Sequence, residues 1–263
     1  MDPFESFKAV QKQGWAHFAP LEAVTTPCAA RLVKWAGVRS GQRLLDVACG
    51  TGVVSITAAR LGARVTGLDL TPELLDRARE NARIAKVEIE WLEGDVEKLP
   101  FGDADFDVVL SEFGHIFAPR PEVTIGEMLR VLKPGGTIAF STWPPELLVG
   151  QIFALSASYL PPPAAVAPPP QWGDPNIVRQ RLSSTVRDIQ FDRATMLIPA
   201  LSPSHHRVAS EKSSGSMARL MAALQSDPAK LEQFRMEYDT LASEYFEDNI
   251  LRQDYLITRA TKV

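Results

Sequence analysis

The stretch LLDVACGTG, residues 44–52, decides the fold class of this chain. A short apolar run of the buried-strand type carries the carboxylate of Asp46, and the chain then turns with Gly50 and Gly52 one residue apart. A helical pattern, VVSITAARL (53–61), follows directly. A strand, a glycine turn and a helix in this order are typical of the ligand-binding edge of a parallel α/β sheet.

Strand and helix patterns alternate from about residue 43 to residue 142. The strands expected in this part are 43–48, 64–69, 87–92, 106–111 and 137–142. The helices expected between them are 53–61, 72–86 and 121–132. This alternation predicts a parallel sheet with helices on both faces.

The rest of the chain adds helices at the start and two strands at the end. A helical pattern covers residues 5–36 with an interruption near Pro20. The later elements expected are a helix at 147–160, a short helix at 175–182, a strand at 184–198, helices across 203–250 with a flexible interruption at 210–216, and a final strand at 254–263. Two late strands separated by helices fit an antiparallel edge on a parallel sheet, which makes seven strands in all.

Composition excludes several classes of protein. The 263 residues are 45% hydrophobic and 23% charged, as expected for one α/β domain with insertions. The net charge of −4 and the lack of a Lys/Arg run disfavour nucleic acid and favour a small-molecule substrate. The two cysteines imply neither a disulfide framework nor a zinc ligand set, and no metal is expected. With no signal-peptide pattern and no membrane-span window, we expect no membrane partner and a cytoplasmic location.

The chemistry of the glycine turn separates its candidate ligands. A third glycine after Gly52, typical of dinucleotide sites, is missing, and so is a phosphate-binding lysine. A carboxylate at Asp46 would repel a phosphate and would suit a ligand that bears an ammonium group. Taken alone, a glycine turn can also be purely structural.

Polar residues also follow the next three strands. Asp69 ends the second strand, 23 residues after Asp46, at the position where a ribose diol is bound in such sheets. Asp95 follows the third strand and could accept from an adenine amino group while Val96 packs on the ring. Ser111 ends the fourth strand at the same crevice. The alternative readings are that Asp69 only starts a turn and that Asp95 is an exposed loop acid.

These segments together resemble the class I methyltransferases that use S-adenosylmethionine, and in particular the bacterial type 11-like small-molecule methyltransferases related to quinone-biosynthesis enzymes. The resemblance covers residues 30–143 well and extends more loosely to the C-terminus, where a proline-rich segment precedes WGDP. It implies a Rossmann-like, doubly wound, seven-stranded and mostly parallel sheet with helical lid insertions. The implied parts of this single domain are a cofactor-binding core (30–143), substrate-lid insertions (144–183 and 203–250) and C-terminal strands (184–198 and 254–263).

The resemblance also implies roles for individual residues. The implied cofactor-binding set is Asp46, Ala48, Gly50 and Gly52 at the methionine end, Asp69 at the ribose, Leu70 beside the adenine, Asp95 and Val96 at the adenine, and Ser111 on the methionine side. Ala48 departs from the family pattern, which often has glycine there. The turn is thus expected to hold the amino-acid end of S-adenosylmethionine, with S-adenosylhomocysteine as product.

Methyl transfer from a sulfonium requires positioning and exclusion of water, and it needs a general base only if the acceptor must lose a proton. His115, just after the fourth strand, is the first candidate base and Glu112 the second, while a packed loop histidine is the alternative for His115. His205 and His206 lie in a polar stretch and are expected to face solvent.

The acceptor is expected to be a small organic molecule methylated on an oxygen or carbon atom. The sequence after the fourth strand, Ser-Glu-Phe-Gly, lacks the Asn/Asp-Pro-Pro-Tyr motif of enzymes that methylate adenine or glutamine nitrogen. Aromatic residues of the expected lid that could meet an apolar acceptor are Trp15, Phe18, Phe153, Tyr159, Trp172, Phe234, Tyr238 and Tyr245. The alternatives are a cofactor-binding protein without catalysis and a nicotinamide-dependent oxidoreductase.

Overall fold

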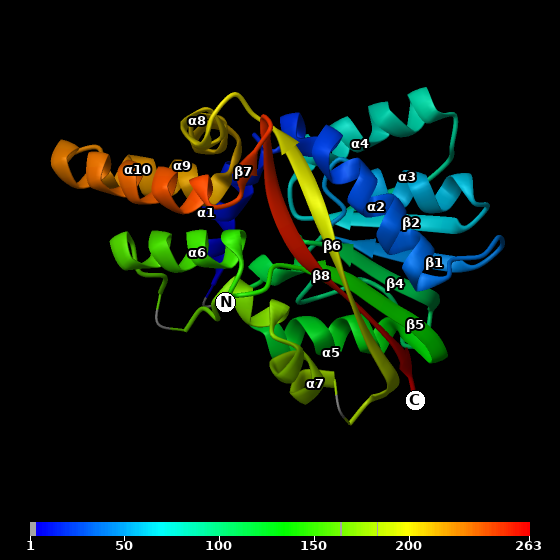
Figure 1. Cartoon of the computed structure of the whole chain (residues 1–263). Helices are drawn as coiled ribbons and strands as arrows, with labels where there is room; N and C mark the ends of the chain where they lie inside the picture. The colour runs from blue at the N-terminus through cyan, green and yellow to red at the C-terminus, as the bar shows by residue number, and fades with distance from the viewer. Residues whose placement is uncertain (1–3, 164, 183) are drawn as a thin grey trace.

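The computed structural model describes residues 4–163, 165–182 and 184–263 (Figure 1). Within them the strands form one sheet in the order β3-β2-β1-β4-β5-β8-β6, with β7 paired to β8. The strands are β1 (Arg43–Val47), β2 (Arg64–Asp69), β3 (Glu90–Glu93), β4 (Phe106–Glu112), β5 (Leu132–Thr142), β6 (Val186–Pro199), β7 (Phe246–Glu247) and β8 (Ile250–Lys262). Strands β1 to β5 pair in parallel, while β8 runs antiparallel to both β5 and β6. The predicted mostly parallel sheet with an antiparallel C-terminal edge is confirmed.

Helices cover both faces of this sheet. They are α1 (Glu5–Trp15), α2 (Glu22–Ala36), α3 (Val53–Arg60), α4 (Pro72–Ala85), α5 (Pro121–Val131), α6 (Leu148–Tyr159), α7 (Pro175–Leu182), α8 (Pro203–Ser213), α9 (Gly215–Leu224) and α10 (Pro228–Ser243). Short 3-10 turns are η1 (Ala19–Leu21), η2 (His115–Phe117) and η3 (Pro169–Gly173). Helices α2, α3 and α4 lie on one face and α5 and α7 on the other (Figure 1). Helix α4 illustrates why these helices pack on the sheet. Its buried residues recur at helical spacing and form one apolar stripe: Leu74, Leu75, Ala78 and Ala82.

The boundaries differ from the sequence-based expectation in four places. Strand β3 starts at Glu90 rather than at residue 87, and β5 starts at Leu132, directly after α5. The interruption expected at 210–216 is reduced to Ser214, between α8 and α9. The helical stretch expected to reach residue 250 ends earlier, because β7 and β8 form a hairpin there.

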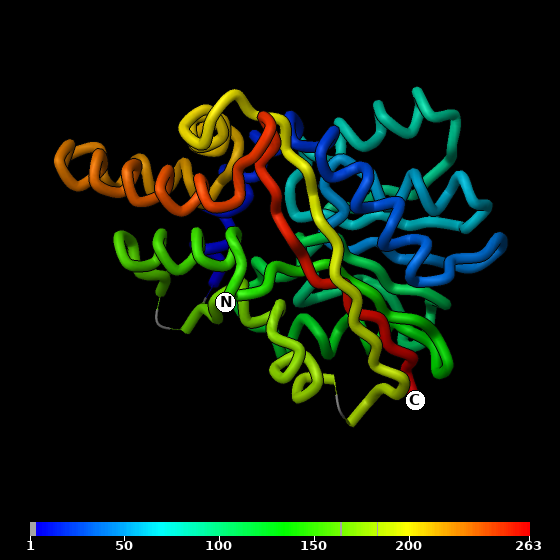
Figure 2. Tube along the Cα trace, in the orientation of Figure 1, coloured from blue at the N-terminus to red at the C-terminus, as the bar shows by residue number. Residues whose placement is uncertain are grey.

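The helices α6, α8, α9 and α10 gather with α1 at one end of the molecule, beyond the carboxyl ends of the parallel strands (Figure 2). They have an apolar core of their own, separate from the main core of the sheet. Its buried side chains include Leu148, Leu220, Leu224, Phe234 and Leu251. Burying one such side chain contributes about 1.5–3 kcal/mol, so these helices form a packed cap rather than a loose loop. Within the described ranges, no helix is long and apolar enough to span a membrane.

Candidate functional site

The turn after β1 brings a buried carboxylate and bare backbone to the carboxyl edge of the sheet. Asp46 Oδ2 accepts from the amide and from the hydroxyl of Ser55, at 3.0 and 2.6 Å. Asp46 Oδ1 is buried without a hydrogen-bond partner among the described residues. Burial is the main cause that raises the pKa of Asp46 to about 7, and the nearby Asp69 raises it further. This oxygen is therefore an acceptor in need of a donor.

The close packing of the Trp91 ring requires a glycine at position 52, where the turn ends. Its φ is +83°, and a Cβ built there would lie 2.6 Å from an atom of the Trp91 ring. Gly52 starts α3 but does not line the cavity described below. Its absence of a side chain lets α3 approach the sheet closely.

Asp69 ties the first turn to the end of β2. Its Oδ2 accepts from the Gly50 amide and its Oδ1 accepts from the Thr71 amide, each at 2.8 Å. Burial raises the pKa of Asp69, while these backbone donors oppose that shift. Each carboxylate oxygen keeps a second acceptor position, so a diol could still be bound here.

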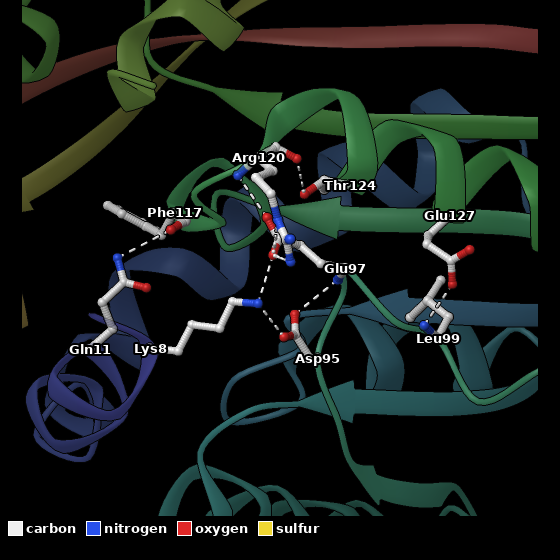
Figure 3. A network of polar contacts seen from close by, with 9 residues as sticks. All are labelled: Lys8, Gln11, Asp95, Glu97, Leu99, Phe117, Arg120, Thr124 and Glu127. Atoms are coloured by element: carbon white, nitrogen blue, oxygen red, sulfur yellow. Dashed lines mark hydrogen bonds and ion pairs between the residues drawn. The ribbon is translucent and has the colours of Figure 1, made fainter. Parts of the chain in front are cut away.

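Asp95 lies after β3 and is reached from the other end of the chain by Lys8. The Lys8 ammonium of α1 lies 2.6 Å from Asp95 Oδ2 and 2.6 Å from Glu97 Oε2 (Figure 3). Glu97 is buried and also accepts from the Arg120 backbone and guanidinium. Asp95 Oδ1 accepts from the Glu97 amide at 2.8 Å. The network holds α1 over the end of β3.

A further carboxyl group closes the floor at the end of β4. Both carboxyl oxygens of Glu112 are buried, and neither has a hydrogen-bond partner among the described residues. Burial raises the pKa of Glu112 well above its usual range, and the charge of Asp46 acts in the same direction. Glu112 therefore keeps its proton to a higher pH than a solvent-exposed glutamate, and in that form it can donate one hydrogen bond and accept others.

The side chains of Asp46, Asp69, Asp95 and Glu112 line one cavity of about 290 Å³. Its floor is formed by the ends of β1, β2, β3 and β4, and its roof by α1, η2, α6, α8 and α9. Aromatic side chains of the roof and rim are Trp15, Phe18, Phe113, Phe117, Trp143, Phe153 and Tyr238. A charged floor under an apolar roof is suited to a ligand with one polar and one apolar part.

The sequence comparisons agree with this geometry. A sequence profile described as a methyltransferase domain matches residues 45–140. An uncharacterized protein of Mycobacterium tuberculosis is 36% identical over 95% of this chain and 93% of its own length. The ubiquinone/menaquinone biosynthesis C-methyltransferase of Roseobacter denitrificans is 39% identical over 41% of this chain and 44% of its own length. The chain belongs to the class I S-adenosylmethionine-dependent methyltransferases.

The fold of a solved methyltransferase agrees as well. Phosphoethanolamine N-methyltransferase 2 of Haemonchus contortus, solved in complex with S-adenosyl-L-methionine, superposes with a TM-score of 0.57. It is 16% identical and the match covers 95% of this chain and 56% of that one. The likeness shows the methyltransferase fold across nearly the whole chain.

Most of the residues expected at the cofactor site of this methyltransferase-family chain do meet in space. Asp46, Ala48, Gly50, Asp69, Leu70, Asp95 and Val96 all line the cavity. Gly52 and Ser111 do not. Ser111 is buried, with its hydroxyl donating to the Val47 carbonyl at 2.8 Å. The expectation that Ser111 lines the methionine side is therefore corrected: it joins β4 to β1.

The position of His115 does not allow it to act as a general base on a molecule in the cavity. It is fully buried between the rings of Phe140 and Trp172, with centroids 4.9 and 4.7 Å away, and it does not line the cavity. Burial lowers the pKa of His115 to about 3. The imidazole is thus a neutral, packed side chain, and the alternative reading of the sequence is the one the geometry supports.

Two residues of the roof were misjudged or missed from sequence. His206 was expected to face solvent, but it is only 6% exposed and lines the cavity. Phe117 lines it too, with its ring tilted by 55° against that of Trp15 at a centroid distance of 4.5 Å. Among the aromatic residues expected at an acceptor pocket, Tyr159, Trp172, Phe234 and Tyr245 pack elsewhere in the two cores. His206 lies within α8, where the other buried residue is the polar Ser213, so no apolar stripe in the sequence marks the inner face of this helix.

Proposed function

We propose that this chain transfers a methyl group from S-adenosylmethionine to an oxygen or carbon atom of a small, partly apolar organic molecule. One observation carries the proposal: a single cavity joins carboxyl groups at the ends of four neighbouring strands to an apolar and aromatic roof. The floor suits a polar, cationic cosubstrate, and the roof suits an apolar acceptor.

The charge balance of the floor fits S-adenosylmethionine. The acidic side chains that line the cavity are Asp46, Asp69, Asp95 and Glu112, and Lys8 is the basic one. The ammonium of Lys8 is already paired with Asp95 and Glu97, so the floor offers acceptors and negative charge. S-adenosylmethionine carries a sulfonium, an ammonium and one carboxylate, which gives a net charge of +1. When bound, it supplies an activated methyl group on sulfur.

Individual residues are assigned to its parts as follows. Asp46 Oδ1, which lacks a donor among the described residues, would accept from the ammonium over the Ala48–Gly50 turn. Asp69 would accept from the ribose hydroxyls, with Leu70 beside the adenine. Asp95 and Val96 would hold the adenine amino edge and face. For these contacts each carboxylate has to accept one more hydrogen bond, and its oxygens still have free lone pairs for that.

The residues of the roof would orient the acceptor and keep water out. Trp15, Phe18, Phe117 and Phe153 come from α1, its following turn, η2 and α6, so closure of the roof depends on several lid elements. We assign residues 30–143 to cofactor binding. Of the insertions 144–183 and 203–250 expected to form the substrate lid, we assign α6, α8, α9 and α10 to the lid, whereas η3 and α7 pack on the sheet near α5 and β6. The quinone C-methyltransferase relative supports a carbon acceptor, but it matches less than half of the chain, so oxygen is kept as an equal target.

The test is a thermal-shift titration with S-adenosylmethionine, S-adenosylhomocysteine and NADH. A ligand at a hundredfold its Kd adds about 2.7 kcal/mol to stability. We expect a rise in Tm with both adenosyl ligands and none with NADH, and a loss of the rise in Asp69→Asn. The matched control is Asp76→Asn, since Asp76 lies on the exposed face of α4. A rise with NADH alone would overturn the proposal, as would no rise with any ligand; binding without transfer to any acceptor would leave a non-catalytic binding protein.

A further inference from the structure

A polar cluster interrupts the apolar roof of the cavity. It consists of His206 on α8, Tyr238 on α10 and Gln253 on β8, all of which line the cavity and are less than 9% exposed. Buried polar side chains cost free energy unless they are paired, so a cluster inside an apolar wall calls for a role. Tyr238 and Gln253 lie 32 and 47 residues after His206 in the sequence, and the packing of the cap brings the three side chains together.

The histidine is bonded well on one side and poorly on the other. His206 Nδ1 lies 3.1 Å from the Tyr238 hydroxyl, and the two rings are nearly parallel. His206 Nε2 lies 3.4 Å from the Gln253 amide nitrogen. That second separation is longer than the distance between donor and acceptor in a typical N–H···O hydrogen bond, about 2.7–3.2 Å. One ring nitrogen of His206, a residue that lines the cavity, is therefore only weakly satisfied.

The position of His206 is fixed by ion pairs behind it. Arg207 bonds to Glu211 and to Asp239 of α10, both at 2.8 Å, and Arg235 of α10 bonds to Glu211 at 2.9 Å. These contacts lock α8 against α10, which carries Tyr238. Burial lowers the pKa of His206 to about 4, and the neighbouring His205 acts in the same direction. The imidazole is thus neutral near pH 7 and keeps an acceptor lone pair.

A hydroxyl group matches this arrangement best. Its O–H could donate to His206 Nε2 while its oxygen accepts from the Gln253 amide, whereas an apolar group would leave these two with only their long contact to each other. A carboxylate could accept from Gln253 but would meet the imidazole lone pair. We propose that His206 and Gln253 bind a hydroxyl group of the methyl acceptor, so that the acceptor is a hydroxylated, largely apolar molecule such as a phenol. This inference rests on the proposed function, since it names the acceptor class for the same cavity.

The test uses 2-naphthol and naphthalene as probes that differ by one hydroxyl group. Equilibrium dialysis is run with wild type, with and without saturating S-adenosylhomocysteine. We expect wild type to bind 2-naphthol about tenfold more tightly than naphthalene, as for one buried hydrogen bond. In His206→Leu that preference falls to about one, while naphthalene binding is retained because the apolar roof is intact.

Two controls separate a binding role from a structural one. His205→Leu changes the adjacent, exposed histidine of the same helix and should keep the full preference. Gln253→Leu should weaken the preference as His206→Leu does. Cooperative unfolding and the Tm rise with S-adenosylhomocysteine show that each variant is folded. The inference would be overturned if wild type did not prefer 2-naphthol to naphthalene, or if His206→Leu kept that preference. If wild type did not bind S-adenosylhomocysteine at all, the result would instead contradict the proposed function.

Discussion

The ammonium of Lys8 lies 2.6 Å from Asp95 Oδ2, although the two residues are 87 positions apart. The contact places the N-terminal helix α1 directly over the strand end where the adenine is expected. Gln11 adds a bond from the same helix to the Phe117 carbonyl at 3.1 Å (Figure 3). Helix α1 is therefore a strap across the cavity, tied to its floor by a nearly buried ion pair.

Removing this tie should speed the release of the cosubstrate. In Lys8→Met we expect the dissociation rate of S-adenosylmethionine to rise about tenfold, because weakening the strap by about 1.4 kcal/mol is enough for that change. Lys12→Met is the matched control, since Lys12 pairs with Glu93 on the exposed side of the same helix and such pairs contribute about 0–1 kcal/mol. Stopped-flow tryptophan fluorescence measures both. Equal rates in the two variants would contradict the role of Lys8.

Ala48 and Gly114 are packed so closely that each limits the other. Ala48 has a φ of +53°, and a Cβ built on Gly114 would lie 2.5 Å from the Ala48 Cβ. Gly114→Ala should therefore lower the free energy of unfolding by about 1–3 kcal/mol, the usual cost of overpacking. Ala48→Gly should recover part of that loss in the double variant. Urea unfolding of the four proteins gives the coupling, and strictly additive effects would show that the two residues do not compete for space.

The raised pKa of Asp46 predicts a pH dependence with a definite sign. In the folded protein Asp46 keeps its proton up to about pH 7, whereas the unfolded chain loses it near 3.8. The folded state thus binds more protons between these values, and the contribution of Asp46 to stability falls as pH rises from about 4 to 7. Ligand-free protein should show this fall in urea unfolding, and Asp46→Asn should lack it.

The ionisation of Asp46 should also make the binding of S-adenosylmethionine stronger at higher pH. A cationic ammonium prefers the ionised carboxylate, so the Kd of S-adenosylmethionine should decrease from pH 5.5 to 7, a range in which its amino group stays protonated. Calorimetric titration at several pH values measures the trend. A Kd that is flat in wild type, or that still falls with pH in Asp46→Asn, would argue against Asp46 as the partner of the ammonium.

Glu112 should make the stability of the protein fall as pH rises. Because burial holds its pKa well above the usual range, the folded state keeps this proton to a higher pH than the unfolded chain does, so the contribution of Glu112 to stability falls as pH rises above the usual range of glutamate. Glu112→Gln puts a neutral side chain of similar shape there and should gain stability relative to wild type as pH rises. Thermal unfolding of both proteins at several pH values checks this, and a Tm difference that does not change with pH would contradict it.

Local signals in the sequence were sufficient for the sheet and for the floor of the cavity. The strands that carry Asp46 and Asp69 are short apolar runs bounded by turn residues, and the carboxyl ends of parallel strands must meet at one edge. The side chains after those strands could thus be placed together without knowledge of tertiary contacts. Ser111 shows the limit of this reasoning, because its strand end is correct but its hydroxyl turns to the Val47 carbonyl instead.

The roof could not be predicted in the same way. His206 is buried only because α8 packs on α10 through Arg207 and Asp239, a pairing of charged residues that sequence patterns do not specify. His115 is removed from the cavity by Trp172, which lies 57 residues further along the chain. The hairpin after α10 was missed because Asp248 and Asn249 adopt φ values of +50° and +61° without the glycine that usually marks such turns.

The most direct test of the account is a crystal structure of the protein with S-adenosylhomocysteine bound. The account predicts the ribose hydroxyls on Asp69, the adenine between Leu70 and Val96 with its amino group toward Asp95, and the amino-acid end over the turn at Ala48 and Gly50. Ligand density outside this cavity, or in it with the ribose away from Asp69, would contradict the account.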